Sequence, residues 1–283
     1  MKKRILLPTD FSKNSLNAIA YAMNLYKRES CEFYILHSYY LPGYKKNNLL
    51  SLEATDERLK AVKERAEKNM EQLKVRVRFN DFGNHHTLHF TSELGPFIDV
   101  LKNSVEKEDI KLIIMGTRGE TDDKNAVLGS NAVDTMEKVR NCPVLTIPGN
   151  VVFKDPNEIV FPTSFKTHYK ESELATLIEI SRLTNAPLRI LHMREIEDLN
   201  TKQLENKKLL NQILDATTFT HHTLYGISLQ DGVRCFAQSR ESEMIAFINK
   251  KHNFFGSIFS NPMVKDLGHN ATVPILAMHD LHH

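Results

Sequence analysis

Short apolar runs alternate with longer amphipathic segments along the first half of the chain. Strands are expected where apolar residues follow one another, as at 4–8, 33–37 and 111–115. Between these runs, apolar residues recur every three to four positions in 15–25 and 50–74, a spacing that predicts helices with one buried face. Further elements are expected as a strand at 86–90, a helix at 96–105, a helix at 130–139 and a strand at 144–147. This alternation is typical of a doubly wound α/β fold with a parallel sheet.

The second half of the chain repeats the first in a shortened form. The matching segments are, in order, Ile5–Ser12 with Ile159–Lys166, Tyr34–His37 with Arg189–His192, and Cys142–Ile147 with Val273–Met278. The offset between matching positions falls from 154 to 131, so the second copy has lost about 23 residues from its middle or late loops. We therefore expect two tandem domains, residues 1–150 and 151–283, each with a five-stranded parallel sheet and each large enough for its own core.

Composition and charge narrow the class of protein. A net charge of +2 excludes a strongly basic nucleic-acid binder, and no apolar run is long enough to cross a bilayer. The apolar stretch after Arg4 stops at Pro8, which argues against a secretory signal. Three widely spaced cysteines without a CxxC pair are typical of reduced, mostly buried thiols, so a cytoplasmic location is expected.

Glycine is scarce but clustered. The chain has 11 glycines in 283 residues, against a usual share of about 7%, and three of them lie at 116, 119 and 129. The pattern G-x2-G-x9-G-S follows a predicted strand and precedes a predicted helix. Glycines in such a turn permit positive φ and close approach of the backbone to a ligand, and the helix N-terminus favours phosphate groups. The alternative is a set of ordinary turn glycines followed by a capping serine.

This glycine pattern, a first strand ending in Pro-Thr-Asp, a second ending in Leu-His and a final Cys-Pro-Val-Leu together resemble the universal stress protein family. The resemblance covers the chain as two tandem copies, with the full motif in the first. It implies domains of strand order 3-2-1-4-5, usually dimeric, in a stress-response protein. It also implies ATP binding, because members with this glycine motif bind ATP.

The resemblance further implies which residues contact the nucleotide. Pro8, Thr9 and Asp10 would lie against the nucleoside, and Ser38 near the adenine. The residues that would flank the ribose and wrap the phosphates are Met115, Gly116, Arg118, Gly119, Gly129, Ser130 and Asn131. Arg118 stands where the family commonly has His and would stay cationic at every pH. The acidic loop 120–123 would repel phosphate unless it points outward or holds a divalent cation such as Mg²⁺, so ADP or AMP is an alternative to ATP.

The second copy departs from the motif. The segment 249–253 stands in place of the first two glycines, and only Gly256 and the serine after it remain. Ser164 replaces Asp10. Lys250 and its neighbouring lysine still attract anions, but a phosphate-holding turn is not expected here. We interpret the second copy as a degenerate partner domain.

Histidines offer further candidate chemistry. The pairs at 85–86 and 221–222 suggest metal, but strand neighbours point to opposite faces and no ligand spacing completes a zinc site, so surface histidines are expected. His37 and His192 are candidate general bases, but the second copy keeps its histidine without the glycine turn, which favours a core-edge role. The terminal His282–His283 is typical of a purification tag and is given no role.

These observations leave three hypotheses. The leading one is a cytoplasmic stress-response protein that binds an adenine nucleotide in its first copy and has no catalytic residues or metal site of its own. The second is a slow ATPase that uses Arg118 to stabilise charge, with Asp10 or an acidic loop residue holding a metal ion. The third is a structural dimerisation protein with an empty site. The expected partners are the nucleotide and either a second chain in a homodimer or the other domain of the same chain.

Overall fold

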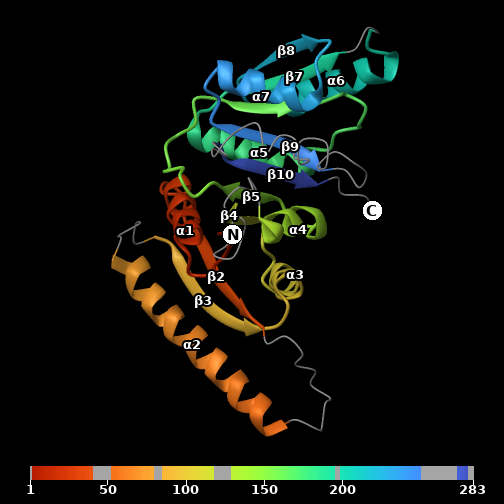
Figure 1. Ribbon diagram of the computed structural model, residues 1–283. Helices are drawn as coiled ribbons and strands as arrows, with labels where there is room; N and C mark the ends of the chain where they lie inside the picture. The colour runs from red at the N-terminus through yellow and green to blue at the C-terminus, as the bar shows by residue number, and fades with distance from the viewer. Residues whose placement is uncertain are drawn as a thin grey trace.

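The structure is a computed structural model that describes residues 2–40, 52–79, 85–117, 129–194, 198–249 and 273–279. Its first half, residues 1–150, alternates strands with helices along the chain (Figure 1). The elements of this half are β1 (Lys3–Pro8), α1 (Lys13–Leu25), β2 (Cys31–Tyr39), α2 (Leu52–Phe79), β3 (Thr87–Leu94), α3 (Phe97–Lys107), β4 (Leu112–Gly116), α4 (Ser130–Lys138) and β5 (Val144–Ile147). The predicted order of strands and helices is confirmed.

The second half, residues 151–283, follows the same plan. Its elements are β6 (Ile159–Pro162), α5 (Glu171–Thr184), β7 (Leu188–Arg194), α6 (Thr201–Ile213), β8 (Phe219–Tyr225), α7 (Leu229–Ser239), β9 (Met244–Asn249) and β10 (Ile275–His279). The glycine and serine at 256–257 lie outside the described residues.

All ten strands belong to one sheet, in the order β3-β2-β1-β4-β5-β10-β9-β6-β7-β8. Each half contributes the predicted parallel order 3-2-1-4-5. The halves meet where β5 and β10 pair antiparallel, with Leu145 opposite Leu276. Because this pairing is antiparallel, the carboxyl ends of the strands of one half lie at the same edge of the sheet as the amino ends of the other.

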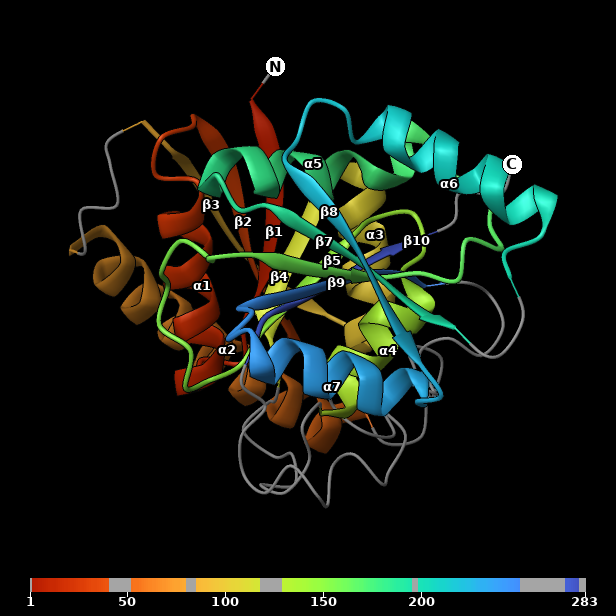
Figure 2. The same cartoon turned by 90° about the horizontal axis from the view of Figure 1, so that it is seen from above.

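Helices cover both faces of the sheet (Figure 2). Buried residues of α1, α2, α5 and α6 form one cluster on the first face, and it includes strand residues of both halves. On the other face, α3 and α4 pack on β4 and β5 and also on Phe247 and Ile275 of the second half, while α7 covers the far end. The buried surface is continuous across the junction, because the β5–β10 pairing brings residues of both halves into the same clusters.

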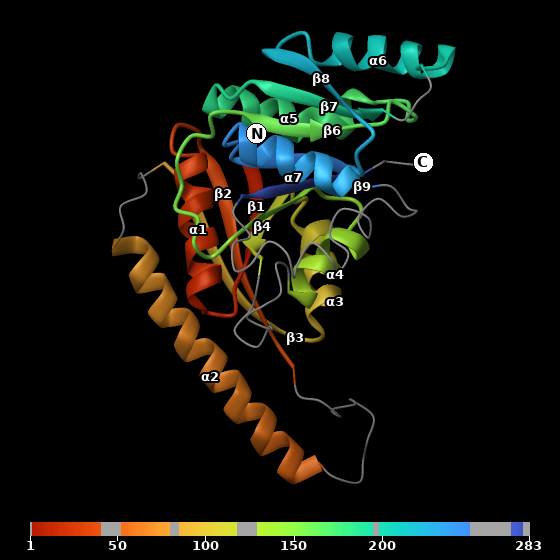
Figure 3. The same cartoon turned by 45° about the horizontal axis from the view of Figure 1, so that its top comes forward.

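Helix α2 shows how the apolar pattern sets the extent of an element. Its buried residues Ala66, Met70, Leu73 and Val77 recur every three to four positions and pack its C-terminal half on the sheet. The helix ends at Phe79, five residues beyond the predicted end, because Val77 continues the buried stripe. The N-terminal half extends away from the sheet (Figure 3).

The structure can be compared with two expectations from composition, mostly buried thiols and the lack of a membrane-spanning segment. Cys31 and Cys142 are buried and Cys235 is exposed, and all three are free thiols. Burial raises the pKa of both Cys31 and Cys142 to about 12. Among the residues that the structure describes, no helix combines the length and the apolar character needed to cross a membrane.

Candidate functional site

A small cavity lies where the first half of the sheet reverses its strand order. It opens at the carboxyl ends of β1, β2 and β4, and β1 lies between the other two. In open α/β sheets this switch point is the usual position of a ligand crevice. The cavity has a volume of about 130 Å³. Its lining residues are Pro8, Thr9, Asp10, Ser15, His37, Ser38, Phe97, Met115, Gly116, Thr117, Asn131 and Ala132.

Most of the residues predicted from the sequence come together in this cavity. Those that line it are Pro8, Thr9, Asp10, Ser38, Met115, Gly116 and Asn131. Gly129 and Ser130 lie at the start of α4, directly before Asn131, but do not line the cavity. Arg118 and Gly119 are outside the described residues. The role of these residues in nucleotide binding remains a prediction.

Thr9 organises the loop between β1 and α1. Its N–H donates to the carbonyl of Leu36 at 2.8 Å, and its carbonyl accepts from Nδ1 of His37 at 2.8 Å. The Thr9 hydroxyl shares a hydrogen bond of 3.0 Å with that of Ser15 and accepts from the N–H of Phe11 at 3.0 Å. Phe11 adopts φ 65°, a left-handed conformation that is uncommon for a bulky residue and turns the chain into the helix. These contacts fix the floor of the cavity.

His37 and Asp10 supply polar groups at this floor. Burial lowers the pKa of His37, and neither its hydrogen bond to the Thr9 carbonyl nor the nearby Asp10 carboxylate cancels this effect. The ring is therefore neutral at pH 7, and because Nδ1 donates its proton, Nε2 is an acceptor. Oδ1 of Asp10 accepts from the N–H of Ser12 at 3.0 Å, which orients the carboxylate.

The second half contains the same arrangement around Thr163. Its N–H donates to Leu191 at 2.8 Å, its carbonyl accepts from Nδ1 of His192 at 2.8 Å, and its hydroxyl accepts from the N–H of Phe165 at 3.2 Å. Phe165 has φ 57°. Because the arrangement recurs in the half that lacks the full glycine motif, it is a feature of the scaffold. This agrees with the core-edge interpretation of both histidines.

Gly116 lies in close contact with α1 at the end of β4. A Cβ placed there would lie 3.2 Å from the backbone C and O of Asn14, which is tighter than nine in ten real Cβ contacts, so the backbone of α1 would have to give by a few tenths of an ångström. Neither Gly116 nor Gly129 has a positive φ; the described glycines that do are Gly95 and Gly226. Two reasons were expected for glycine at these positions: close approach of the backbone and a positive φ. Close approach applies at Gly116, although the group that comes close is α1 and not a ligand. The expectation of a positive φ is wrong for both glycines.

Helix α4 begins beside the cavity without a capping side chain. Gly129, at φ −75°, is the N-cap, and its N–H donates to the carbonyl of Thr117 at 2.7 Å. Ser130 is the first helical residue, so the expectation that it caps the helix is wrong. No acidic side chain lies in the first turn. The partial positive charge of this helix end, next to Asn131, is therefore not offset by an acidic side chain in the first turn of the helix itself.

Bulkier residues occupy the corresponding positions of the second half. Because Leu112 pairs with Ile5 and Met244 with Ile159, the residue that matches Gly116 is Ile248. Asn249 therefore corresponds to Thr117, which corrects the expected alignment by one position. Met193 similarly matches Ser38, because Phe33 pairs with Ile5 and Leu188 with Ile159. Ser164 takes the place of Asp10. Tyr169 is buried and its hydroxyl bonds that of Thr163, as the smaller Ser15 does with Thr9.

Several lining residues were not predicted from the sequence. Thr117 lies inside the glycine motif, so its position was a usable signal. Ser15 and Ala132 lie in the first turns of amphipathic helices, and Phe97 begins α3 after Gly95 and a proline. Nothing in the spacing of these three residues connects them with β1, since their proximity depends on the order of strands in the sheet.

Other histidine clusters do not form a second site among the described residues. No group of three or more His, Cys, Asp or Glu side chains there is arranged to hold a metal ion. His221 bonds Oδ1 of Asn211 at 2.8 Å, and the His85 and His86 rings contact each other. Burial lowers the pKa of both His86 and His221 to about 4, so these two rings are neutral at pH 7.

Comparison with known proteins identifies similar chains. The model of the universal stress protein family matches residues 1–148. A universal stress protein of Methanocaldococcus jannaschii, MJ0531, is 29% identical over 151 residues, which is 51% of this chain and 81% of that protein. The crystal structure of a universal stress protein from Archaeoglobus fulgidus has a TM-score of 0.70 at 18% identity and covers 97% of both chains. A functionally unknown protein from Pseudomonas aeruginosa, PA1789, has a TM-score of 0.60 at 12% identity and covers 98% of this chain and 92% of its own.

Proposed function

The chain belongs to the universal stress protein family, and from that premise we propose that its first half binds an adenine nucleotide at the cavity between β1 and β4. The ligand is ATP, with ADP and AMP as alternatives. The protein then acts as a ligand-sensing component of a stress response, without a chemical step of its own. The second half supports the first and has no nucleotide site.

The observation that carries the proposal is the position of the cavity beside a helix N-terminus that has no capping side chain among the described residues. Polar groups of Thr9, Asp10 and Ser38 line one side, and α4 begins on the other. Its volume of about 130 Å³ is below the roughly 300–1,000 Å³ of a typical ligand pocket. The described cavity therefore suits the nucleoside end, and the phosphates would extend toward the first turn of α4.

The chemistry of the lining residues matches a nucleoside. The Asp10 carboxylate is a strong acceptor for ribose hydroxyls, and Ser38 lies at the end of β2, where it reaches the base. Met115 and Phe97 add apolar surface for a planar ring. A divalent cation bound with the phosphates would be held by the nucleotide and by the acidic loop 120–123, which lies outside the described residues.

The proposal includes no chemical step because the arrangement around the candidate base recurs in the half that lacks the full glycine motif. The Nδ1 proton of His37 is directed to the Thr9 carbonyl, and the second half repeats this bond at His192. We therefore assign the effect of the nucleotide to linkage, in which the ligand stabilises the conformation that binds it. A ligand at 100 times its Kd adds about 2.7 kcal/mol to the unfolding free energy.

Thermal unfolding with ATP, ADP and AMP tests the proposal. At roughly 2–4 °C per kcal/mol, saturating nucleotide is expected to raise Tm by about 5–10 °C. Asp10→Ser, which installs the second-half residue, should weaken binding by about 1.5–3 kcal/mol, because a charged hydrogen-bond acceptor is lost. The reciprocal Ser164→Asp is the matched control and should leave the shift unchanged. No shift with any of the three nucleotides at millimolar concentration would refute the proposal.

The location and assembly of the protein complete the proposal. Three free thiols, two of them buried, fit a reducing compartment such as the cytoplasm. Of the two assemblies expected, a homodimer and pairing of the two halves, the β5–β10 ladder supports the second. Light scattering after size exclusion should therefore give the mass of one chain, and a dimeric mass would favour the first.

A further inference from the structure

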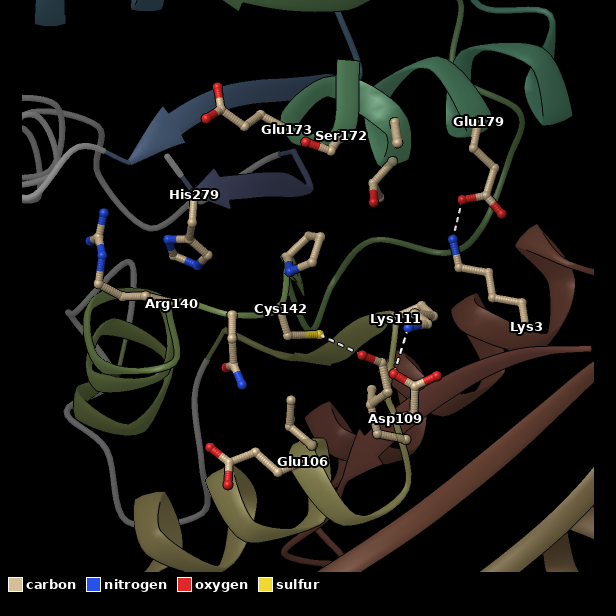
Figure 4. Close-up of a pocket in the computed structure, with 16 residues that line it drawn as sticks. Lys3, Glu106, Asp109, Lys111, Arg140, Cys142, Ser172, Glu173, Glu179 and His279 are labelled. Carbon is tan, nitrogen blue, oxygen red and sulfur yellow. Dashed lines mark hydrogen bonds and ion pairs between the residues drawn. The ribbon is translucent and has the colours of Figure 1, made fainter. Parts of the chain in front are cut away.

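A second and larger cavity lies at the junction of the two halves. It has a volume of about 530 Å³, within the range of ligand pockets, and shares no lining residue with the candidate nucleotide site. It is bounded by Lys3 at the start of β1, by the residues that precede β4 and β5, by His279 at the end of β10 and by the first turns of α5 (Figure 4). We call it the junction cavity.

The internal repeat shows which part of the molecule corresponds to the junction cavity. Helix α5 matches α1 at an offset of 155, since buried residues coincide at that spacing. The matched pairs are Ile19 with Leu174, Ala22 with Leu177, Met23 with Ile178, and Leu25 with Ile180. The strand registers likewise match Lys111 with Glu243, the residues before β4 and β9. The surface of α1 beside Glu243 is therefore the counterpart of the surface of α5 beside Lys111.

In the first half, that surface is covered by the segment that connects the two halves. Residues 148–157 run from β5 to β6 over α1. The Asn17 side chain donates to the carbonyls of Pro148 at 3.2 Å and Val151 at 2.8 Å. The ring of Phe153 packs edge-on against Tyr21, with centroids 5.0 Å apart. Next along the segment, Lys154 forms an ion pair with Glu243. The surface of α1 beside Glu243 thus holds residues 148–157 through two of their backbone carbonyls, the Phe153 ring and the charge of Lys154.

The corresponding residues around α5 line the junction cavity. Asn17 and Tyr21 correspond to Ser172 and Thr176, and Glu243 corresponds to Lys111; all three counterparts line it. A threonine in place of the tyrosine leaves space where Tyr21 meets Phe153. The lysine in place of Glu243 reverses the charge that a bound segment would meet.

Of the other charged groups that line the cavity, Lys3 and Arg140 lie at its ends, and the carboxylates of Glu106, Asp109, Glu173 and Glu179 line it as well. Lys3 forms an ion pair with Glu179 at one end, and at the other Arg140 donates to the carbonyl of Asn249 at 2.7 Å (Figure 4). Lys111 contacts Asp109 at 2.5 Å, but its side chain is 56% exposed, so its ammonium group has donors left for a second carboxylate.

We propose that the junction cavity binds an extended segment of a partner protein in the way that α1 holds residues 148–157. The segment carries an aromatic side chain that fills the space beside Thr176. The residue after it is acidic and pairs with Lys111. This inference does not depend on the nucleotide site.

Two peptides test the proposal on the full chain. One has the sequence of residues 150–157, and the other carries Glu in place of the lysine at 154. Fluorescence anisotropy should show the glutamate peptide binding about two- to fivefold more tightly, the range that a half-exposed ion pair supports. Lys111→Glu should reverse the preference. Lys107→Glu, an equal charge change on α3 outside the cavity, should preserve it.

A blocking variant separates binding in the cavity from binding elsewhere. Ala175 is exposed on α5 and lines the cavity, so Ala175→Trp should leave the circular dichroism spectrum unchanged and weaken both peptides tenfold or more. The proposal is overturned if neither peptide binds at millimolar concentration. It is equally overturned if Lys111→Glu leaves the preference unchanged, or if Ala175→Trp binds as the unaltered protein does.

Discussion

Glu158 is the centre of a buried ion-pair network that makes the stability of the second half depend on pH. It precedes β6 and is 4% exposed. Its carboxylate accepts from Arg189 at 2.7 Å, from Arg240 at 2.8 Å through two nitrogens, and from the Ser242 hydroxyl at 2.6 Å. These groups come from β7, from the end of α7 and from the residues before β9, so one carboxylate joins three elements.

The size of its contribution follows from its pKa. Burial alone would raise the pKa of Glu158, but the hydrogen bonds from Arg240, Ser242 and Arg189 outweigh burial and lower it to about 2, from an ordinary 4.5. At about 1.36 kcal/mol per pH unit, this difference is worth about 3 kcal/mol of unfolding free energy. Because the folded pKa is the lower one, the contribution is complete above about pH 4.5 and is lost as the pH falls through 2.

Glu158→Gln should therefore lower the unfolding free energy by about 2–3 kcal/mol at pH 7. By pH 3 this gap, the difference in unfolding free energy between the unaltered protein and the variant, should fall to roughly half. The chain has no tryptophan, so urea unfolding is followed by circular dichroism. Glu205→Gln, at an exposed position of α6, is the control and should cost less than about 0.5 kcal/mol. A gap at pH 3 as large as that at pH 7 would refute the reasoning, since other carboxylates titrate equally in both proteins.

Further predictions concern the thiols and the contact between the halves. In the native protein at pH 8, a thiol reagent should modify the exposed Cys235 quickly and leave Cys31 and Cys142 unreacted until denaturant is added. The reason is that Cys31 and Cys142 are buried and their pKa is raised to about 12. Rapid reaction of a second thiol would contradict this prediction. Asn249 is 3% exposed and donates to the carbonyl of Met136 at 2.8 Å, across the junction. Asn249→Ala should cost about 1–3 kcal/mol in urea unfolding because that buried acceptor loses its partner, and a change below about 0.5 kcal/mol would show that the contact is not needed.

The sequence predicted the elements well where a local pattern determines them. The apolar run before Gly116 and the stripe through Ala66 and Met70 each depend on neighbours along the chain, and both were recovered. The Thr and His that recur at the ends of the first two strands of each half are in contact in the structure. His37 bonds the Thr9 carbonyl in the first half, and His192 bonds the Thr163 carbonyl at the matching positions of the second.

What the sequence did not predict depends on contacts between distant segments. Buried clusters that include residues of both halves follow from the pairing of Leu145 with Leu276, and nothing in either strand specifies an antiparallel partner. The role of Gly116 in meeting Asn14 depends on how closely α1 approaches β4. The strand register was needed to show that the bulky Ile248 of the second half corresponds to Gly116 of the first.

The stoichiometry of nucleotide binding tests the central claim most directly. Isothermal titration of the full chain with ATP, ADP and AMP should reach one nucleotide per chain with at least one of them. Ser38→Met, which installs the residue found at position 193 of the second half, should abolish nucleotide binding. The matched control Met193→Ser should still bind one nucleotide per chain. No binding, two nucleotides per chain, or binding unchanged by Ser38→Met would contradict the assignment of a single site to the first half.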